Sequence, residues 1–211
     1  MRIVCLPVMS IPGLIVNVYF YYDEDTKSGI VIDPGGEPER ICRFIADNEL
    51  KIEGILFTHG HFDHLLAVNA VKEATSAPVA CHSADGDMLR SPKPNFFDDF
   101  SQDTGIEPDI LFRDGDVFEF GGHKMNVIHT PGHSPGGVSY YAKESAALFS
   151  GDTLFYDSVG RTDFPGGSSA TLTASIKDKL FTLPDDTAVY PGHGESTSIG
   201  YEKANNPFVR F

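Results

Sequence analysis

The sequence has no tryptophan, only three cysteines and few basic residues. The cysteines, Cys5, Cys42 and Cys81, are odd in number and dispersed, which excludes a disulfide framework and makes a reducing cytoplasm the expected compartment. Lysine and arginine number 16 against 30 aspartates and glutamates, so the formal net charge is −14. Because a negative field repels phosphate backbones and anionic bilayers, we expect neither nucleic acid nor a membrane as a partner.

The chain also lacks an uninterrupted apolar run. Apolar residues dominate from Ile3 to Phe20, but Pro7, Pro12 and Gly13 interrupt the stretch. Two prolines and a Pro-Gly turn are incompatible with a continuous spanning helix, and no small-x-small cleavage pattern follows. We therefore expect two strands joined by a turn, in a soluble, unprocessed chain.

What the sequence does contain is the balance of one globular domain: 211 residues, 41% apolar and 22% charged. Short β-rich runs alternate with helical stripes, and neither a linker nor a low-complexity segment divides them. This alternation predicts a single α/β domain over residues 1–211, with sheets between helices. The expected strands are 2–8, 15–22, 29–33, 52–57, 78–81, 118–120, 124–129, 138–141, 146–149 and 188–190, and the expected helices are near 38–45, 65–71 and 172–180.

Residues 91–109 break this rhythm. The segment contains three prolines, three phenylalanines and several acidic or amide side chains, which predicts a long loop or a broken helix. It is either a lid over a site or a surface excursion that its phenylalanines pin to the body.

The histidines are not scattered. His59, His61 and His64 lie within six positions together with Asp63, directly after an expected apolar strand. Imidazole nitrogen and carboxylate oxygen are the ligands that Zn²⁺ and similar cations prefer. An irregular loop that passes into a helix near Asp63 can divide these side chains between two adjacent metals.

Three further candidates follow later strands at glycine-containing turns. They are His133 in Pro-Gly-His, Asp152 in Ser-Gly-Asp and His193 in a second Pro-Gly-His. A small neighbour lets the backbone bend tightly and carry a ligand over a strand end. Any one of these residues alone is more typical of a capped turn or a packed histidine, but the set predicts a metal site.

The run Thr58-His59-Gly60-His61-Phe62-Asp63-His64, followed in order by His133, Asp152 and His193, resembles the full signature of the metallo-β-lactamase fold superfamily. The resemblance covers nearly the whole chain and implies a four-layer αβ/βα sandwich with the site along one edge of the sheets. It further implies one metal held by His59, His61 and His133, a second held by Asp63, His64 and His193, and Asp152 bridging the two. Asp63 and Asp152 are then the candidate catalytic carboxylates.

Within that superfamily, three stretches resemble the glyoxalase II group, above all its short bacterial members: Ile32 to Gly36, Gly160 to Gly167, and the tail from Pro191 to Phe208. Only 18 residues follow His193, so we do not expect the C-terminal helical domain with which two-domain members grip glutathione. The resemblance implies hydrolysis of an acylated glutathione such as S-lactoylglutathione. A hydroxide between two divalent ions would attack, with zinc expected and iron or manganese also acceptable to these ligands.

Other chemistries fit parts of the same sequence. The Gly-Arg-Thr-Asp-Phe stretch from Gly160 to Phe164 also resembles persulfide dioxygenases, which use one iron held by two histidines and one carboxylate. His59, His133 and Asp152 would supply that triad. The Pro-Gly-Gly that follows Phe164 favours the hydrolase.

Two readings are disfavoured on chemical grounds. A non-enzymatic scaffold is one, because structural zinc sites are closed four-ligand sets without a shared carboxylate. A serine nucleophile is the other: residues 132–136 match G-x-S-x-G, but Pro135 has no N–H to offer an oxyanion hole.

Several residues near these motifs have open roles. Arg161 is expected either to bind a carboxylate of an anionic substrate or to pair with Asp163 or Asp157 and fix its loop. Asp33 either orients a metal-bound histidine or caps a turn. The remaining histidines, His82, His123 and His129, are expected at the surface or in packing, with a supporting role beside a ligand open for His129.

Overall fold

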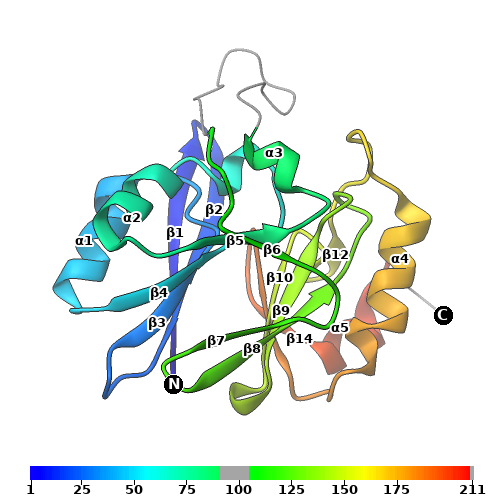
Figure 1. The fold of residues 1–211 in the computed structure, drawn as a ribbon. Helices are drawn as coiled ribbons and strands as arrows, with labels where there is room; N and C mark the ends of the chain where they lie inside the picture. Colours follow the sequence, from blue (N-terminus) through cyan, green and yellow to red (C-terminus); the bar gives the residue numbers. More distant parts are fainter. Residues whose placement is uncertain (91–104, 210–211) are drawn as a thin grey trace.

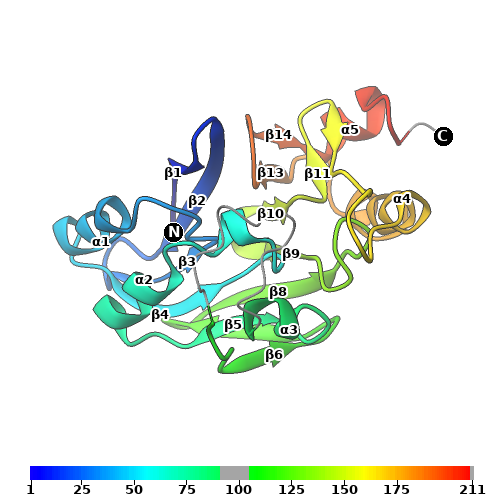
Figure 2. The same cartoon turned by 90° about the horizontal axis from the view of Figure 1, so that it is seen from above.

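The computed structural model describes residues 1–90 and 105–209. Two six-stranded sheets pack face to face, and helices cover the outer side of each (Figure 1, Figure 2). This is the four-layer αβ/βα arrangement that the family resemblance implies.

The first sheet has the order β1-β2-β3-β4-β5-β6. Strands β1 to β3 are antiparallel, whereas β3 to β6 are parallel and are connected through helices on the outer face. Pro38 occupies the first turn of α1, as expected, and Ile41 and Ile45 turn its apolar face inward. The elements are β1 (Arg2–Ile11), β2 (Leu14–Tyr22), β3 (Ser28–Ile32), α1 (Pro38–Asp47), β4 (Lys51–Leu56), α2 (Val68–Thr75), β5 (Val79–His82), α3 (Gly86–Arg90) and β6 (Ile110–Phe112).

The second sheet has the order β14-β13-β10-β9-β8-β7, and a two-stranded ribbon, β11-β12, stands beside it. Its outer face is covered by two helices whose N-caps, Ser168 and Ser198, each accept a hydrogen bond from the first helical turn. The elements are β7 (Val117–Phe120), β8 (His123–His129), β9 (Val138–Ala142), β10 (Ala147–Gly151), β11 (Leu154–Phe155), β12 (Ser158–Val159), α4 (Ser169–Asp178), β13 (Ala188–Pro191), β14 (Thr197–Ser198) and α5 (Ile199–Asn205).

An aromatic core joins the two sheets and fixes their spacing near the strand ends. The Tyr140 hydroxyl, from the second sheet, donates to the Phe57 carbonyl just beyond β4 at 2.6 Å. In the opposite direction, the Tyr19 hydroxyl donates to the Pro191 carbonyl at 2.7 Å. Each phenol thereby satisfies its polar atom within the core. As a result, the chain at the ends of β4 and β13 is fixed in position against the opposite sheet.

Most sequence-based expectations for local structure hold. The stretch from Ile3 to Phe20 forms the β1-β2 hairpin, and Gly13 takes a φ of +87° in its turn. In the described ranges, no helix combines the length and the apolar content needed to cross a membrane. Of the expected loop at 91–109, residues 91–104 lie outside the described residues, and 105–109 form neither helix nor strand.

One expected helix begins later than predicted. The sequence placed its start near Leu65, but the chain first makes a 3₁₀ turn over Phe62–His64, and α2 begins at Val68. The 3₁₀ turn lets Asp63 and His64, which are adjacent in sequence, both lie buried at the sheet edge. Leu65 still packs in the apolar core.

Candidate metal centre

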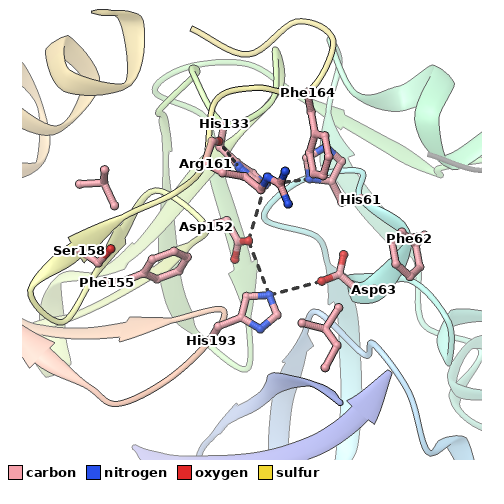
Figure 3. Close-up of a pocket in the computed structure, with 12 residues that line it drawn as sticks. His61, Phe62, Asp63, His133, Asp152, Phe155, Ser158, Arg161, Phe164 and His193 are labelled. Atoms are coloured by element: carbon pink, nitrogen blue, oxygen red, sulfur yellow. Dashed lines mark hydrogen bonds and ion pairs between the residues drawn. The ribbon is translucent and has the colours of Figure 1, made fainter. Parts of the chain in front are cut away.

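The seven predicted residues come together where strands of both sheets end. The loop after β4 and the 3₁₀ turn carry the first four, His133 lies in the β8-β9 connection, and Asp152 and His193 follow β10 and β13. Figure 3 shows five of the seven: His61, Asp63, His133, Asp152 and His193. A parallel pairing of β10 with β13 places the last two ends side by side. The site therefore lies along one edge of the sandwich.

The side chains form two clusters. The ligand-capable atoms of His59, His61 and His133 lie within 4.8 Å of one another, and so do those of Asp63, His64 and His193. These are the two trios that the family resemblance implies. A third, overlapping group contains Asp33, His59 and His64.

Asp152 lies between the two clusters. Its Oδ2 is 3.6 Å from Nε2 of His133 and 3.6 Å from Nε2 of His193 (Figure 3). Its Oδ1 is 3.5 Å from Nε2 of His64. One carboxylate thus faces histidines of both trios, which is the position that a bridging ligand needs.

Backbone carbonyls orient two of the histidines. His133 donates from Nδ1 to the Arg161 carbonyl at 2.7 Å, and His193 donates from Nδ1 to the Ile15 carbonyl at 2.5 Å. Because a carbonyl can only accept, each neutral imidazole keeps its proton on Nδ1 and turns an unprotonated Nε2 toward the site.

Asp33 performs both of the roles left open by the sequence. Its carboxylate accepts from the Thr58 N–H at 2.8 Å and the Thr58 hydroxyl at 2.6 Å, which caps the turn after β4. It also accepts from Nδ1 of His64 at 3.0 Å. The Thr58 oxygen in turn lies 3.1 Å from Nδ1 of His59, so Asp33 helps to orient two site histidines.

The donor set fits divalent cations. Nε2 of His64 and Oδ1 of Asp152 are buried without any hydrogen-bond partner. Nε2 of His59 lies 3.3 Å from Nε2 of His133, although the hydrogen bonds of both rings place their protons on Nδ1. His61 Nδ1 lies 2.8 Å from the same Nε2 of His133, so three imidazoles converge on one point. Buried ring nitrogens and a carboxylate oxygen that converge in this way are a donor set that suits a divalent cation.

The two clusters differ in electrostatics. Burial and the neighbouring imidazoles hold the pKa of His59 well below its usual value, and burial together with His133 lowers the pKa of His61 to about 4. Burial opposes a charge on His64 as well, but Asp63, Asp33 and Asp152 outweigh burial and raise its pKa to about 10. Without metal, His59 and His61 are therefore neutral at pH 7 while His64 carries a proton.

This difference predicts unequal proton release on metal uptake. A histidine must be neutral to bind a cation. His59 and His61 are neutral at pH 7, because the pKa of each lies well below its usual value, whereas His64 stays protonated up to about pH 10 and must lose its proton. We expect binding at the second cluster to strengthen as the pH rises from 6 to 8 because His64 must release this proton, whereas His59 and His61 have no such proton to release at the first. Calorimetry in two buffers of different ionisation enthalpy counts the protons, and equal release for both binding events would contradict this expectation.

A cavity of about 460 Å³ opens over the clusters. Much of its wall is apolar. Leu14 contributes from the β1-β2 hairpin, Phe155 and Val159 from the β11-β12 ribbon, Phe62 from the 3₁₀ turn and Phe164 from the loop before α4. Arg161 is the one lysine or arginine among the described residues that line it.

Arg161 is paired in this structure. Its Nε and Nη2 donate to the two carboxylate oxygens of Asp163 at 2.7 and 2.6 Å, and its guanidinium lies 4.1 Å from the ring centre of Phe164. Of the pairings considered from the sequence, the one with Asp163 is therefore present. Asp157 instead accepts from the Tyr201 hydroxyl.

The other histidines lie outside the clusters. The rings of His82 and His129 stack with their centres 3.9 Å apart, and His129 donates to the Pro135 carbonyl. His123 lies between Asp23 and Glu144. These three histidines thus have packing or surface contacts. The three cysteines are free thiols.

Sequence reasoning missed one buried acid, Asp85, which contacts loops of the first cluster. The sequence shows it only as an aspartate in a short turn after β5. The one feature of the sequence that could have indicated Asp85 is its position after a parallel strand, at the sheet edge where the other site residues lie.

The fold and its donor set define a metal-binding α/β sandwich of the metallo-hydrolase class. The profile of the Metallo-beta-lactamase superfamily matches residues 11–193, and the chain belongs to this superfamily.

Two sequence relatives match over most of their length. The chain is 37% identical to "Probable metallo-hydrolase YqgX" of Bacillus subtilis, covering 95% of each chain. It is 36% identical to "Hydroxyacylglutathione hydrolase GloC" of Haemophilus influenzae, covering 88% of this chain and 89% of the relative.

Solved structures show the same architecture. BLEG-1, described as a B3 metallo-beta-lactamase, superposes with a TM-score of 0.93 at 39% identity, covering 99% of both chains. TTHA1623 in a di-iron-bound form gives 0.82 at 38% identity, covering 96% of this chain and 99% of that one. ETHE1 from Myxococcus xanthus gives 0.77 at 30% identity, covering 97% of this chain and 83% of that one.

Proposed function

We propose that the protein is a metal-dependent thioester hydrolase that acts on acylated glutathione. The observation that carries this proposal is the position of Asp152, 3.6 Å from Nε2 of both His133 and His193. A carboxylate shared by two trios would allow both cations to be held in one pocket, where they would supply the activation of water. The similarity to GloC supports the choice of a glutathione thioester as the substrate.

In this proposal, His59, His61 and His133 hold one divalent cation and Asp63, His64 and His193 hold the other, with Asp152 shared. When bound, the two cations would lower the pKa of a common water from 15.7 toward about 7 and neutralise charge on the thioester oxygen. Zinc suits this donor set, as do iron and manganese. The di-iron form of TTHA1623 makes elemental analysis of the purified protein the necessary first measurement.

The chain's own residues supply orientation and charge. Although burial opposes ionisation, His64 and His193 hold the pKa of Asp63 well below its usual value, so this carboxylate remains ionised beside Asp152. The two carboxylates can accept hydrogen bonds from the attacking water and hold it in place. The leaving thiolate needs little help from an acid because the pKa of a thiol is only about 8.5. The apolar walls of the cavity suit the acyl group.

We expect S-lactoylglutathione to be cleaved under anaerobic conditions without oxygen consumption. Hydrolysis consumes only water, so removing oxygen leaves the rate unchanged. Release of free thiol, followed with a thiol reagent, measures the reaction, and a β-lactam tested in parallel addresses the similarity to BLEG-1.

The second candidate is a persulfide dioxygenase with a single iron on His59, His133 and Asp152. The Gly160 to Phe164 stretch and the similarity to ETHE1 favour it. Oxygen uptake with glutathione persulfide by the iron-loaded protein, without thioester cleavage, would establish this candidate and overturn the hydrolase.

Arg161 provides a test of substrate contact. A guanidinium binds a carboxylate in bidentate fashion, and glutathione carries carboxylates. We expect Arg161→Ala to raise KM by roughly threefold to tenfold with kcat little changed, because a contact made equally to substrate and transition state is lost. Steady-state kinetics with S-lactoylglutathione measures both constants.

The matched variant is Asp163→Asn, which releases the guanidinium from its present partner and should lower KM. A lower kcat and a lower Tm in Arg161→Ala would instead mean that the residue only fixes its loop. Unchanged kinetics together with unchanged Tm would refute both roles.

A further inference from the structure

A second buried carboxylate, Asp85, lies beneath the first cluster. It occupies the turn between β5 and α3 and is fully buried, with 0% of its surface exposed. Within residues 1–90 and 105–209, no lysine or arginine is bonded to it; its side chain accepts three hydrogen bonds from neutral donors instead. Burying a carboxylate is costly unless its oxygens are bonded, so these three donors are what keep it in place.

All three donors belong to the two loops that carry the first cluster. Oδ2 accepts from the Gly60 N–H at 3.0 Å and from the Ser134 hydroxyl at 2.6 Å, and Oδ1 accepts from the Gly136 N–H at 2.6 Å. Gly60 lies between His59 and His61 in the sequence. Ser134 directly follows the third histidine of the cluster.

The close approach of these loops to Asp85 is built into the sequence. A Cβ on Gly136 would lie 2.6 Å from Cγ of Asp85, so only glycine fits there. A Cβ on Gly60 would lie 2.6 Å from Cβ of Met88, in α3. The turn that carries Asp85 is therefore wedged between the two loops and fixes the distance between them.

We propose that Asp85 is a positioning residue for the cation held by His59, His61 and His133. This inference rests on the ligand assignment of the proposed function. The β4 loop and the β8-β9 loop come from different sheets, and a single carboxylate bonded to both sets how closely their histidines approach. Asp33 is bonded directly to His64 of the second cluster and reaches His59 of the first cluster only through Thr58. Asp85, by contrast, is bonded to both loops of the first cluster.

Asp85→Asn tests this role with little change of volume. An amide keeps one acceptor oxygen and replaces the other with an NH₂ donor, which then faces an N–H or O–H group. We expect affinity at the first cluster to fall tenfold to 100-fold, the range seen when a group that orients a metal ligand is removed. Affinity at the second cluster should change less than threefold.

The control is Asp87→Asn, two positions further on in α3. Asp87 is exposed and its carboxylate bonds Arg90, so its substitution should change neither affinity. Ser134→Ala removes one of the three bonds to Asp85 and should weaken the first site in the same direction by a smaller factor. It also keeps the inference testable if Asp85→Asn does not fold.

The experiment is a Co²⁺ titration of metal-free protein, followed by calorimetry and visible absorption. His193→Ala isolates the first cluster and His61→Ala isolates the second, and Asp85→Asn is introduced into each. Weakening confined to the His193→Ala background is the expected result. Equal weakening in both backgrounds, or none in either, would overturn the positioning role.

The readout is independent of substrate, so failure of thioester hydrolysis leaves the result interpretable. If neither His61→Ala nor His193→Ala removes a binding event, the ligand assignment itself is wrong, and the role of Asp85 is refuted with it.

Discussion

Asp152→Asn should lower kcat/KM for thioester hydrolysis by a factor on the order of 10³. Enzymes lose rate by about this factor when a group that stabilises charge in the transition state is removed. The carboxylate faces His64, His133 and His193 at 3.5 to 3.6 Å, and no other acid in the described part of the chain lies between the clusters in this way. An amide carries no charge and offers one oxygen, so it cannot serve two cations at once. Metal analysis of the same sample should show that metal content falls below two per chain.

The matched control is Asp157→Asn in the same segment. Asp157 has a φ of +52°, a conformation that asparagine also tolerates, so this exchange removes a charge without backbone strain. We expect unchanged metal content and turnover. His59→Ala should resemble Asp152→Asn in losing metal and activity. Full metal content and full turnover in both site variants would refute the ligand assignment.

The positions of the seven site residues could be predicted because each follows a recognisable strand. Glycine-containing turns marked His133, Asp152 and His193, and the spacing from His59 to His64 marked the rest. The same reasoning could not find Asp85. Its partners, Gly60, Ser134 and Gly136, are 25 or more residues away in sequence, and only the packing of two sheets brings them together.

The limits of the fold prediction have the same physical origin. Strands with a clear apolar pattern were predicted, such as β2 with its nearly continuous apolar run and β8 with its alternation. In contrast, β6, β11, β12 and β14 are two or three residues long and too short to show a pattern. Their conformation is set by tertiary pairing: β6 by its parallel register with β5, and β14 by its antiparallel register with β13. The sequence did not decide which aspartate pairs with Arg161 for a related reason. A surface ion pair depends on the conformation of its loop, and no sequence pattern predicts that conformation.

Gly160→Ala should be the most damaging single-methyl change near the site. A Cβ built on Gly160 would lie 1.8 Å from the Asp152 carbonyl oxygen and 3.3 Å from Cβ of His133. The obstructing atoms include backbone, which cannot swing aside as a flexible side chain can. Overpacking of this kind costs about 1–3 kcal/mol of unfolding free energy. The chain should also shift Asp152 and His133 relative to each other, and a displacement of about 1 Å in a site can cost on the order of 100-fold in rate.

The comparison variant is Gly115→Ala. Gly115 has a φ of +83° with nothing within 4 Å of an added Cβ, so alanine there suffers left-handed strain of about 1–2 kcal/mol without a collision. Both variants should lose stability in thermal unfolding, but only Gly160→Ala should lose activity and metal affinity per folded molecule. Equal activity in the two variants would show that the backbone at Asp152 can move without disturbing the carboxylate. In that case the spacing between the clusters must be set by the metal-facing side chains themselves, and not by the close packing of Gly160 on the Asp152 backbone.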